Sequence, residues 1–100
     1  MDLFQENTNQ LNQLCSIHKV KSLYAFGSVI TNNFNKNSDI DLLVDFHNVD
    51  IEKYADNYYD LKFALEKLLK RGIDLLEDKA INNPYLRATI DKNKKIIYAA

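Results

Sequence analysis

Apolar residues recur along this chain with a helical period in two regions. In residues 3–18 the apolar residues would lie on one face of a helix, which predicts a single amphipathic helix with His18 at its last turn. A longer helix is predicted from Ile51 to Leu69 or Lys70, and Gly72 is expected to end it as the residue just past the last turn. Its apolar stripe steps by four, three, four and three residues through Tyr54, Tyr58, Leu61, Leu65 and Leu68. This spacing favours packing over base stacking for the two tyrosines.

Three other segments are rich in β-branched and aromatic residues and predict strands, namely Val20–Phe26, Ile40–Phe46 and Ile73–Glu77. The second is apolar on both faces in its middle, so we expect it to lie inside a sheet. Weaker signals predict a short helix over 28–33, a loop over 32–38, a short helix starting at Asn83-Pro84, and an edge strand or extended tail over 95–98.

Composition indicates one globular domain spanning residues 1–100, because 46% of the 100 residues are apolar and 27% are charged. Thirteen basic and 14 acidic residues are interspersed, which argues against direct nucleic-acid binding. Cys15 is the only cysteine, so no internal disulfide can form and a reducing compartment is expected. With no signal-peptide pattern and no apolar run of membrane-spanning length, the expected location is the cytoplasm, away from membranes.

The candidate chemistry lies around the loop between the first two strands. Ser38-Asp39-Ile40-Asp41 opens the second strand, and residues two apart in a strand point to the same face. Two carboxylates held together repel each other unless a cation lies between them, and Mg²⁺ prefers such oxygen ligands together with substrate phosphates. At the other side of the loop, Gly27 allows close approach of the backbone to a ligand, and a helix starting at Ser28 would direct N–H groups at an anion.

A third carboxylate, Asp74, stands near the start of the third predicted strand. It would complete a site for two metal ions, in which Asp39 and Asp41 bridge both ions and Asp74 holds the second. Asp74 would also accept the proton of an attacking hydroxyl. Asp45 has the same strand parity but lies too far along the strand to join the site, so we interpret it as a structural or surface residue.

The spacing of Gly27-Ser28, Ser38-Asp39-Ile40-Asp41 and Ile73-Asp74-Leu75-Leu76 resembles the nucleotidyltransferase superfamily of DNA polymerase β, in particular the minimal, MntA-like nucleotidyltransferases. The resemblance implies an α+β fold with a small mixed β-sheet backed by helices. It also implies that Asp39, Asp41 and Asp74 are catalytic and bind two Mg²⁺ ions, while the glycine and the two serines bind the nucleotide, usually ATP.

Members of this family are commonly paired with a helical HEPN toxin, and the resemblance implies an antitoxin that transfers AMP to a tyrosine of that toxin. One departure is visible: many relatives have an arginine soon after Gly-Ser, whereas residues 29–32 here are Val-Ile-Thr-Asn. Lys36, Arg71 or Arg87 are candidates to replace it as a phosphate ligand.

A non-catalytic antitoxin that neutralises the toxin by binding is the alternative. Nucleic-acid polymerisation is disfavoured by the charge balance, and the sequence is compatible with either a homo- or a hetero-oligomer.

Overall fold

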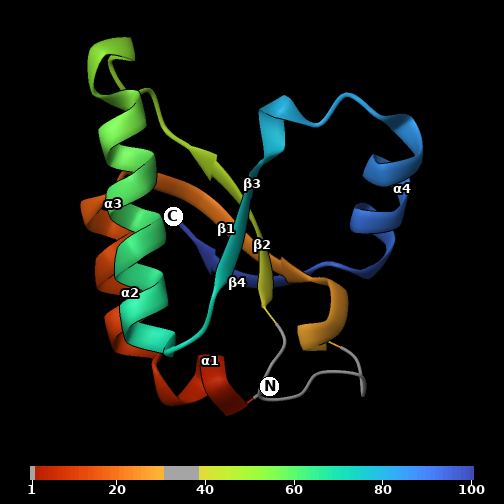
Figure 1. Cartoon of the computed structure of the whole chain (residues 1–100), viewed down its shortest axis with the longest axis horizontal. Helices are drawn as coiled ribbons and strands as arrows, with labels where there is room; N and C mark the ends of the chain where they lie inside the picture. Colours follow the sequence, from red (N-terminus) through yellow and green to blue (C-terminus); the bar gives the residue numbers. More distant parts are fainter. Residues whose placement is uncertain (1, 31–38) are drawn as a thin grey trace.

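Four strands form one sheet with helices on both sides of it (Figure 1). The structure is a computed structural model that describes residues 2–30 and 39–100. In chain order, the elements are α1 (Asp2–Glu6), α2 (Thr8–Ile17), β1 (Val20–Phe26), the 3₁₀ turn η1 (Gly27–Ile30), β2 (Ile40–Phe46), α3 (Ile51–Leu69), β3 (Ile73–Glu77), the 3₁₀ turn η2 (Asp78–Ala80), α4 (Pro84–Asn93) and β4 (Lys95–Ala99). The predicted bounds of β1, β2, β3 and α3 are confirmed.

The strand order is β3-β2-β1-β4, and the sheet is mixed. β1 runs antiparallel to both β2 and β4, whereas β2 and β3 are parallel and are connected through α3. β2 therefore lies inside the sheet and β4 at an edge, as the sequence predicts. The α+β class with a small mixed sheet is confirmed.

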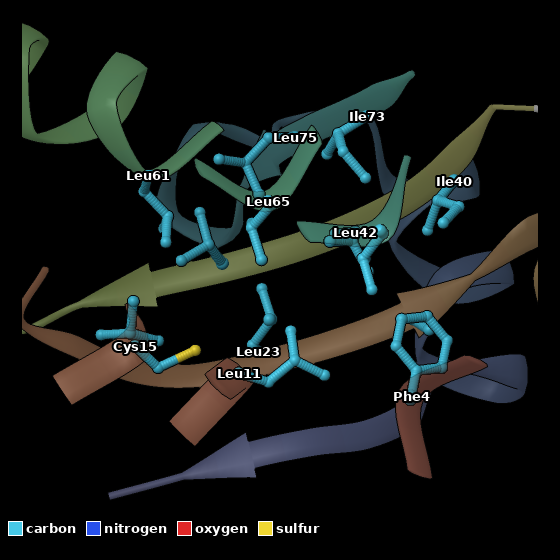
Figure 2. Close-up of a cluster of buried hydrophobic side chains, with 14 of the residues drawn as sticks. Phe4, Leu11, Cys15, Leu23, Ile40, Leu42, Leu61, Leu65, Ile73 and Leu75 are labelled. Carbon is cyan, nitrogen blue, oxygen red and sulfur yellow. The ribbon is translucent and has the colours of Figure 1, made fainter. Parts of the chain in front are cut away.

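The core lies between one face of the sheet and helices α1, α2 and α3. Figure 2 shows apolar side chains from these helices meeting side chains from the sheet in one continuous layer. In β2, alternate residues Ile40, Leu42 and Val44 are 0% exposed, so the intervening positions point to the opposite face. Full burial of such a side chain contributes about 1.5–3 kcal/mol, which fixes the register of β2 and thereby the direction of Asp41.

The single N-terminal helix expected over 3–18 is wrong, because the chain forms two helices separated at Asn7. The Asn7 side-chain amide donates to the Leu3 carbonyl at 2.8 Å, and the Thr8 hydroxyl donates to the Gln5 carbonyl at 3.0 Å. Such local bonds compete with the helical ladder and allow the chain to turn. His18 does lie at a helix end, with Nδ1 2.7 Å from the Leu14 carbonyl oxygen.

Tyr54 and Tyr58 of α3 pack against the core, which confirms the packing interpretation. The Tyr54 hydroxyl donates to the Glu77 carboxylate, and the Tyr58 hydroxyl donates to the Leu75 carbonyl oxygen. These bonds join α3 to β3, so the helix and the strand that carries Asp74 are held together by polar contacts as well as apolar ones.

Helix α4 lies on the other side of the sheet from α2 and α3 (Figure 1). Asn83 caps it as predicted, accepting from the Tyr85 backbone N–H at 2.9 Å, and Ile90 is 1% exposed. The Lys94 ammonium lies 4.4 Å from the ring centre of Tyr24 in β1. Among the residues that the structure describes, no helix is long and apolar enough to cross a membrane.

Candidate active site

The predicted acidic residues come together at one end of the sheet. Because β2 and β3 are parallel and both begin at this end, Asp41 and Asp74 are paired in register and point to the same face. Asp39 directly precedes β2. The antiparallel pairing of β1 and β2 puts Phe26 opposite Asp41, so the turn that follows Phe26 begins beside the carboxylates.

Negative charge accumulates at this end of the sheet. Burial raises the pKa of the half-buried Asp41 carboxyl above its usual value, and the charges of Asp74 and Asp39 raise it further. An ionised Asp41 is therefore less favourable here than in water, and a bound cation would relieve the cost. Within residues 2–30 and 39–100, the observed ion pairs involve other carboxylates, those of Asp45, Asp78 and Asp91.

Gly27 makes the close approach of β1 and β2 possible at this point. It has a left-handed φ of 73°, and a Cβ atom placed on it would lie 2.3 Å from Oδ2 of Asp41. The glycine thus permits both the turn and the position of the carboxylate. Ser28 continues into the η1 backbone, and its hydroxyl lies outside what the structure describes. Ser38 and Lys36 also lie outside the described residues.

Gly72 is a second close neighbour of the site, and sequence reasoning missed it. A Cβ atom on Gly72 would lie 2.5 Å from Oδ1 of Asp39. The expectation that Gly72 ends α3 as the residue just past its last turn is wrong, because α3 ends at Leu69 and Lys70 caps it with a left-handed φ of 56°. The position directly before an acidic strand was the available signal, since a parallel neighbour would bring that position beside Asp39.

Arg87, one of the candidate phosphate ligands, is held elsewhere. Its guanidinium donates to the Asp78 carboxylate at 2.5 Å and to the Asp78 carbonyl oxygen. The Asp78 carboxylate is the main cause that raises the pKa of Arg87. Arg87 is thus engaged in joining α4 to the end of β3, and this geometry does not favour it as a replacement for the missing arginine.

The three carboxylates suit Mg²⁺ as ligands but do not surround an ion by themselves. The three carboxylates offer only oxygen ligands, which are the ligands of a hard cation, and the carboxylate of Asp41 needs a counter-charge. Among the described side chains, however, no three acidic, histidine or cysteine groups lie close enough to enclose a metal ion by themselves. A magnesium ion here would keep water and substrate phosphate as ligands, as it commonly does.

A small cavity of about 150 Å³ lies at the opposite end of β2, lined by Asp45, Phe46, His47, Glu77 and Lys79 among others. Lys79 Nζ lies 3.6 Å from Asp45 Oδ1, a buried atom with no hydrogen-bond partner among the described residues, and Glu77 accepts from Tyr54. We place the candidate site at the start of β2 and β3, where Asp41 and Asp74 are paired in register beside the Gly27 turn and Asp39 directly precedes β2.

A family model of the nucleotidyltransferase domain matches residues 8–97 of this chain. The chain belongs to the nucleotidyltransferase family. A Methanocaldococcus jannaschii protein named as a protein adenylyltransferase is 36% identical over 76 residues, which are 76% of this chain and 75% of the relative. The agreement of this match with the Gly-Ser and acidic-strand pattern confirms the family expected from the sequence.

Solved structures of nucleotidyltransferases share the fold. A minimal nucleotidyltransferase is 29% identical to this chain, with a TM-score of 0.77 and 95% of each chain covered. A chain from the complex of a tri-AMPylated Shewanella oneidensis HEPN toxin with an MNT antitoxin is 21% identical, with a TM-score of 0.66, 97% of this chain covered and 73% of the other. The second likeness shows the fold alone.

Proposed function

We propose that this nucleotidyltransferase transfers AMP from ATP to the hydroxyl of a tyrosine on a HEPN-type toxin, and so acts as the antitoxin of the pair. The observation that carries the proposal is the placement of Asp39, Asp41 and Asp74 at the end of the sheet beside the Gly27 turn, where burial and the charges of Asp74 and Asp39 raise the pKa of Asp41. The protein adenylyltransferase name of a relative and the AMPylated toxin of a structural neighbour support the choice of AMP and of a protein acceptor.

In this proposal, Asp39 and Asp41 would each bind both of two Mg²⁺ ions, and Asp74 would bind only one of the two. The ions, when bound, neutralise charge on the entering and leaving oxygens. Gly27, Ser28 and Ser38 hold the β- and γ-phosphates, which directs the α-phosphorus toward the carboxylates. Asp74 takes the proton of the acceptor hydroxyl, for which its exposure leaves room.

The reaction forms a bond from the acceptor oxygen to the α-phosphorus and breaks the bond between the α-phosphorus and the bridging oxygen of pyrophosphate. Because the paired Asp41 and Asp74 lie on the sheet face away from α2 and α3, a hydroxyl on a second macromolecule can approach them without displacing the core. We take residues 1–100 as a single domain that performs this step in the cytoplasm.

The test is transfer of α-phosphate-labelled ATP to the HEPN-type protein encoded beside this chain, with Mg²⁺ present. Wild type, Asp39→Asn/Asp41→Asn and the matched Asp45→Asn variant are compared. We expect label on the partner with wild type and with Asp45→Asn, and none with the double variant. Label at the wild-type rate with the folded double variant would contradict the assignment of these carboxylates.

The second candidate function is neutralisation of the toxin by binding alone. It is favoured by residues 29–32, which lack an arginine, and by Arg87, which is bound to Asp78. In cells that express the toxin, the Asp39→Asn/Asp41→Asn variant separates the two functions. Restored growth with this variant would favour occlusion, whereas loss of protection by a folded variant that still binds the toxin would favour AMP transfer.

A further inference from the structure

We propose that Gly72 is a positioning residue for Asp39, because only a residue without a side chain lets the Asp39 carboxylate lie against the backbone between α3 and β3. This inference rests on the proposed function, in which Asp39 binds Mg²⁺. It assigns a role in the site to a residue that has no side chain of its own.

The space around Gly72 is occupied by the carboxylate of Asp39. A Cβ atom on Gly72 would lie 2.5 Å from Oδ1, 3.1 Å from Cγ and 3.7 Å from Oδ2 of Asp39. The first distance is shorter than any Cβ atom tolerates, and the second is tighter than an ordinary van der Waals contact. An alanine at residue 72 and the observed position of Asp39 therefore exclude each other.

The backbone conformation does not require glycine at this position. α3 is capped by Lys70, whose left-handed φ of 56° lets its N–H reach the Glu66 carbonyl oxygen at 2.9 Å. Gly72 lies outside the left-handed region, which L residues avoid, so its φ is open to alanine. The end of α3 therefore does not explain why residue 72 is glycine, whereas the closeness of the Asp39 carboxylate does.

The backbone at Gly72 is held in place from both sides. The Ile40 N–H donates to the Gly72 carbonyl oxygen at 2.9 Å, and the Ile73 N–H donates to the Glu66 carboxylate at 3.2 Å. Ile40 and Ile73 are themselves paired in the parallel ladder, with 0% and 4% exposure. A methyl group at residue 72 would therefore displace the exposed Asp39 carboxylate rather than the strands.

Displacing this carboxylate moves one of the proposed metal ligands while leaving the core intact. Loss of an interaction that orients a metal ligand typically weakens metal affinity or activity by about 10–100-fold. We expect Gly72→Ala to fold, to raise the Mg²⁺ concentration that gives half of the Mg²⁺-induced rise in Tm by about tenfold or more, and to lower AMP transfer in proportion.

The experiment is a double-mutant cycle on the free energy of unfolding, measured without ATP, with wild type, Gly72→Ala, Asp39→Ala and the double variant. We expect Gly72→Ala to change the free energy of unfolding less favourably when Asp39 is present than in Asp39→Ala, where alanine at an accessible φ should have little effect or a stabilising effect. Should Gly72→Ala fail to fold, folding of the double variant would show the same coupling.

An equal destabilisation with and without the Asp39 carboxylate would overturn the inference, and so would failure of both Gly72 variants to fold. The cycle does not depend on catalysis. If wild type transfers no AMP but the coupling between residues 39 and 72 is present, the proposed function fails and the positioning role stands. If transfer is present and the coupling is absent, the positioning role alone fails.

Discussion

The two ends of the β2–β3 pair carry similar numbers of acidic residues but differ in the groups that surround those residues. At the end where these strands finish, Asp45 lies 3.6 Å from the Lys79 ammonium and Glu77 accepts from the Tyr54 hydroxyl. The Lys79 ammonium offsets the charge of Asp45, whose buried Oδ1 has no hydrogen-bond partner among the described residues, and the Tyr54 hydroxyl satisfies an oxygen of Glu77. This end therefore holds α3 and the η2 turn to the sheet.

At the end where β2 and β3 begin, Asp41 and Asp74 are paired in register and Asp39 directly precedes β2. Asp41 is half-buried, and burial together with the charges of Asp74 and Asp39 raises the pKa of its carboxyl. Folding keeps these groups together at a cost in stability, and that is typical of residues placed for chemistry. The comparison teaches that acidic residues brought into register on parallel strands beside a glycine turn, rather than acidic residues as such, mark the site.

The largest expected effect is the loss of transfer in Asp41→Asn. We expect at least a 10²–10³-fold lower rate, as for loss of one group that stabilises transition-state charge. Asp45→Asn changes the same residue type on the same strand and should keep the rate within about twofold. Steady-state AMP transfer measures both, and equal losses in the two variants would contradict the division between the ends.

Gly27→Ala should be the most destabilising single change at the site. Alanine at a φ of 73° costs about 1–2 kcal/mol, and its Cβ would also collide with the Asp41 carboxylate. Urea unfolding should therefore give a clearly lower free energy of unfolding. The variant Asp41→Ala/Gly27→Ala removes the collision but keeps the backbone strain, so it should recover only part of the loss.

Tyr54→Phe should affect the partnered end alone. Removing the hydroxyl leaves Glu77 without this donor and should lower the free energy of unfolding by about 1 kcal/mol. AMP transfer per folded molecule should remain at the wild-type level. A large loss of transfer at unchanged Tm would instead connect this end to the chemistry.

Arg87→Ala is expected to have the smallest effect. It breaks the bonds from the guanidinium to Asp78 on an exposed surface, so Tm should fall only slightly. Because Arg87 is engaged with Asp78, the KM for ATP should be unchanged. A several-fold rise in that KM would identify Arg87 as a phosphate ligand after rearrangement and would contradict the role given to it here.

The strands and the long helix were predictable because alternation and turn residues act locally. The pairing of Asp41 with Asp74 followed from two acidic strands, and the structure brings those residues together. The break at Asn7 was not predictable from apolar spacing, because it depends on side-chain bonds to Leu3 and Gln5 that compete with the helix.

The remaining misses depend on tertiary contacts. Gly72 was interpreted as a helix end, but its neighbour Asp39 is brought to it by the parallel register of β2 and β3. Arg87 was left open as a phosphate ligand, and its actual partner Asp78 lies on a turn nine residues earlier in the chain. The partner of Arg87 could not be inferred without the relative placement of α4 and the sheet, whereas that of Gly72 required knowing that β2 and β3 are parallel neighbours.

The most direct measurement is calorimetric unfolding of wild type and Asp41→Asn as a function of pH, with and without Mg²⁺. A raised pKa in the folded state means that the contribution of Asp41 to stability is full below the usual carboxyl pKa and is lost as pH rises through the raised value. Without metal at neutral pH, Asp41→Asn should therefore unfold at a higher temperature than wild type. Mg²⁺ should raise the Tm of wild type and leave that of Asp41→Asn nearly unchanged. The account would be contradicted by a lower Tm for metal-free Asp41→Asn than for wild type, together with an equal Mg²⁺ effect on the two proteins. In that case Asp41 would neither cost stability without a cation nor bind Mg²⁺.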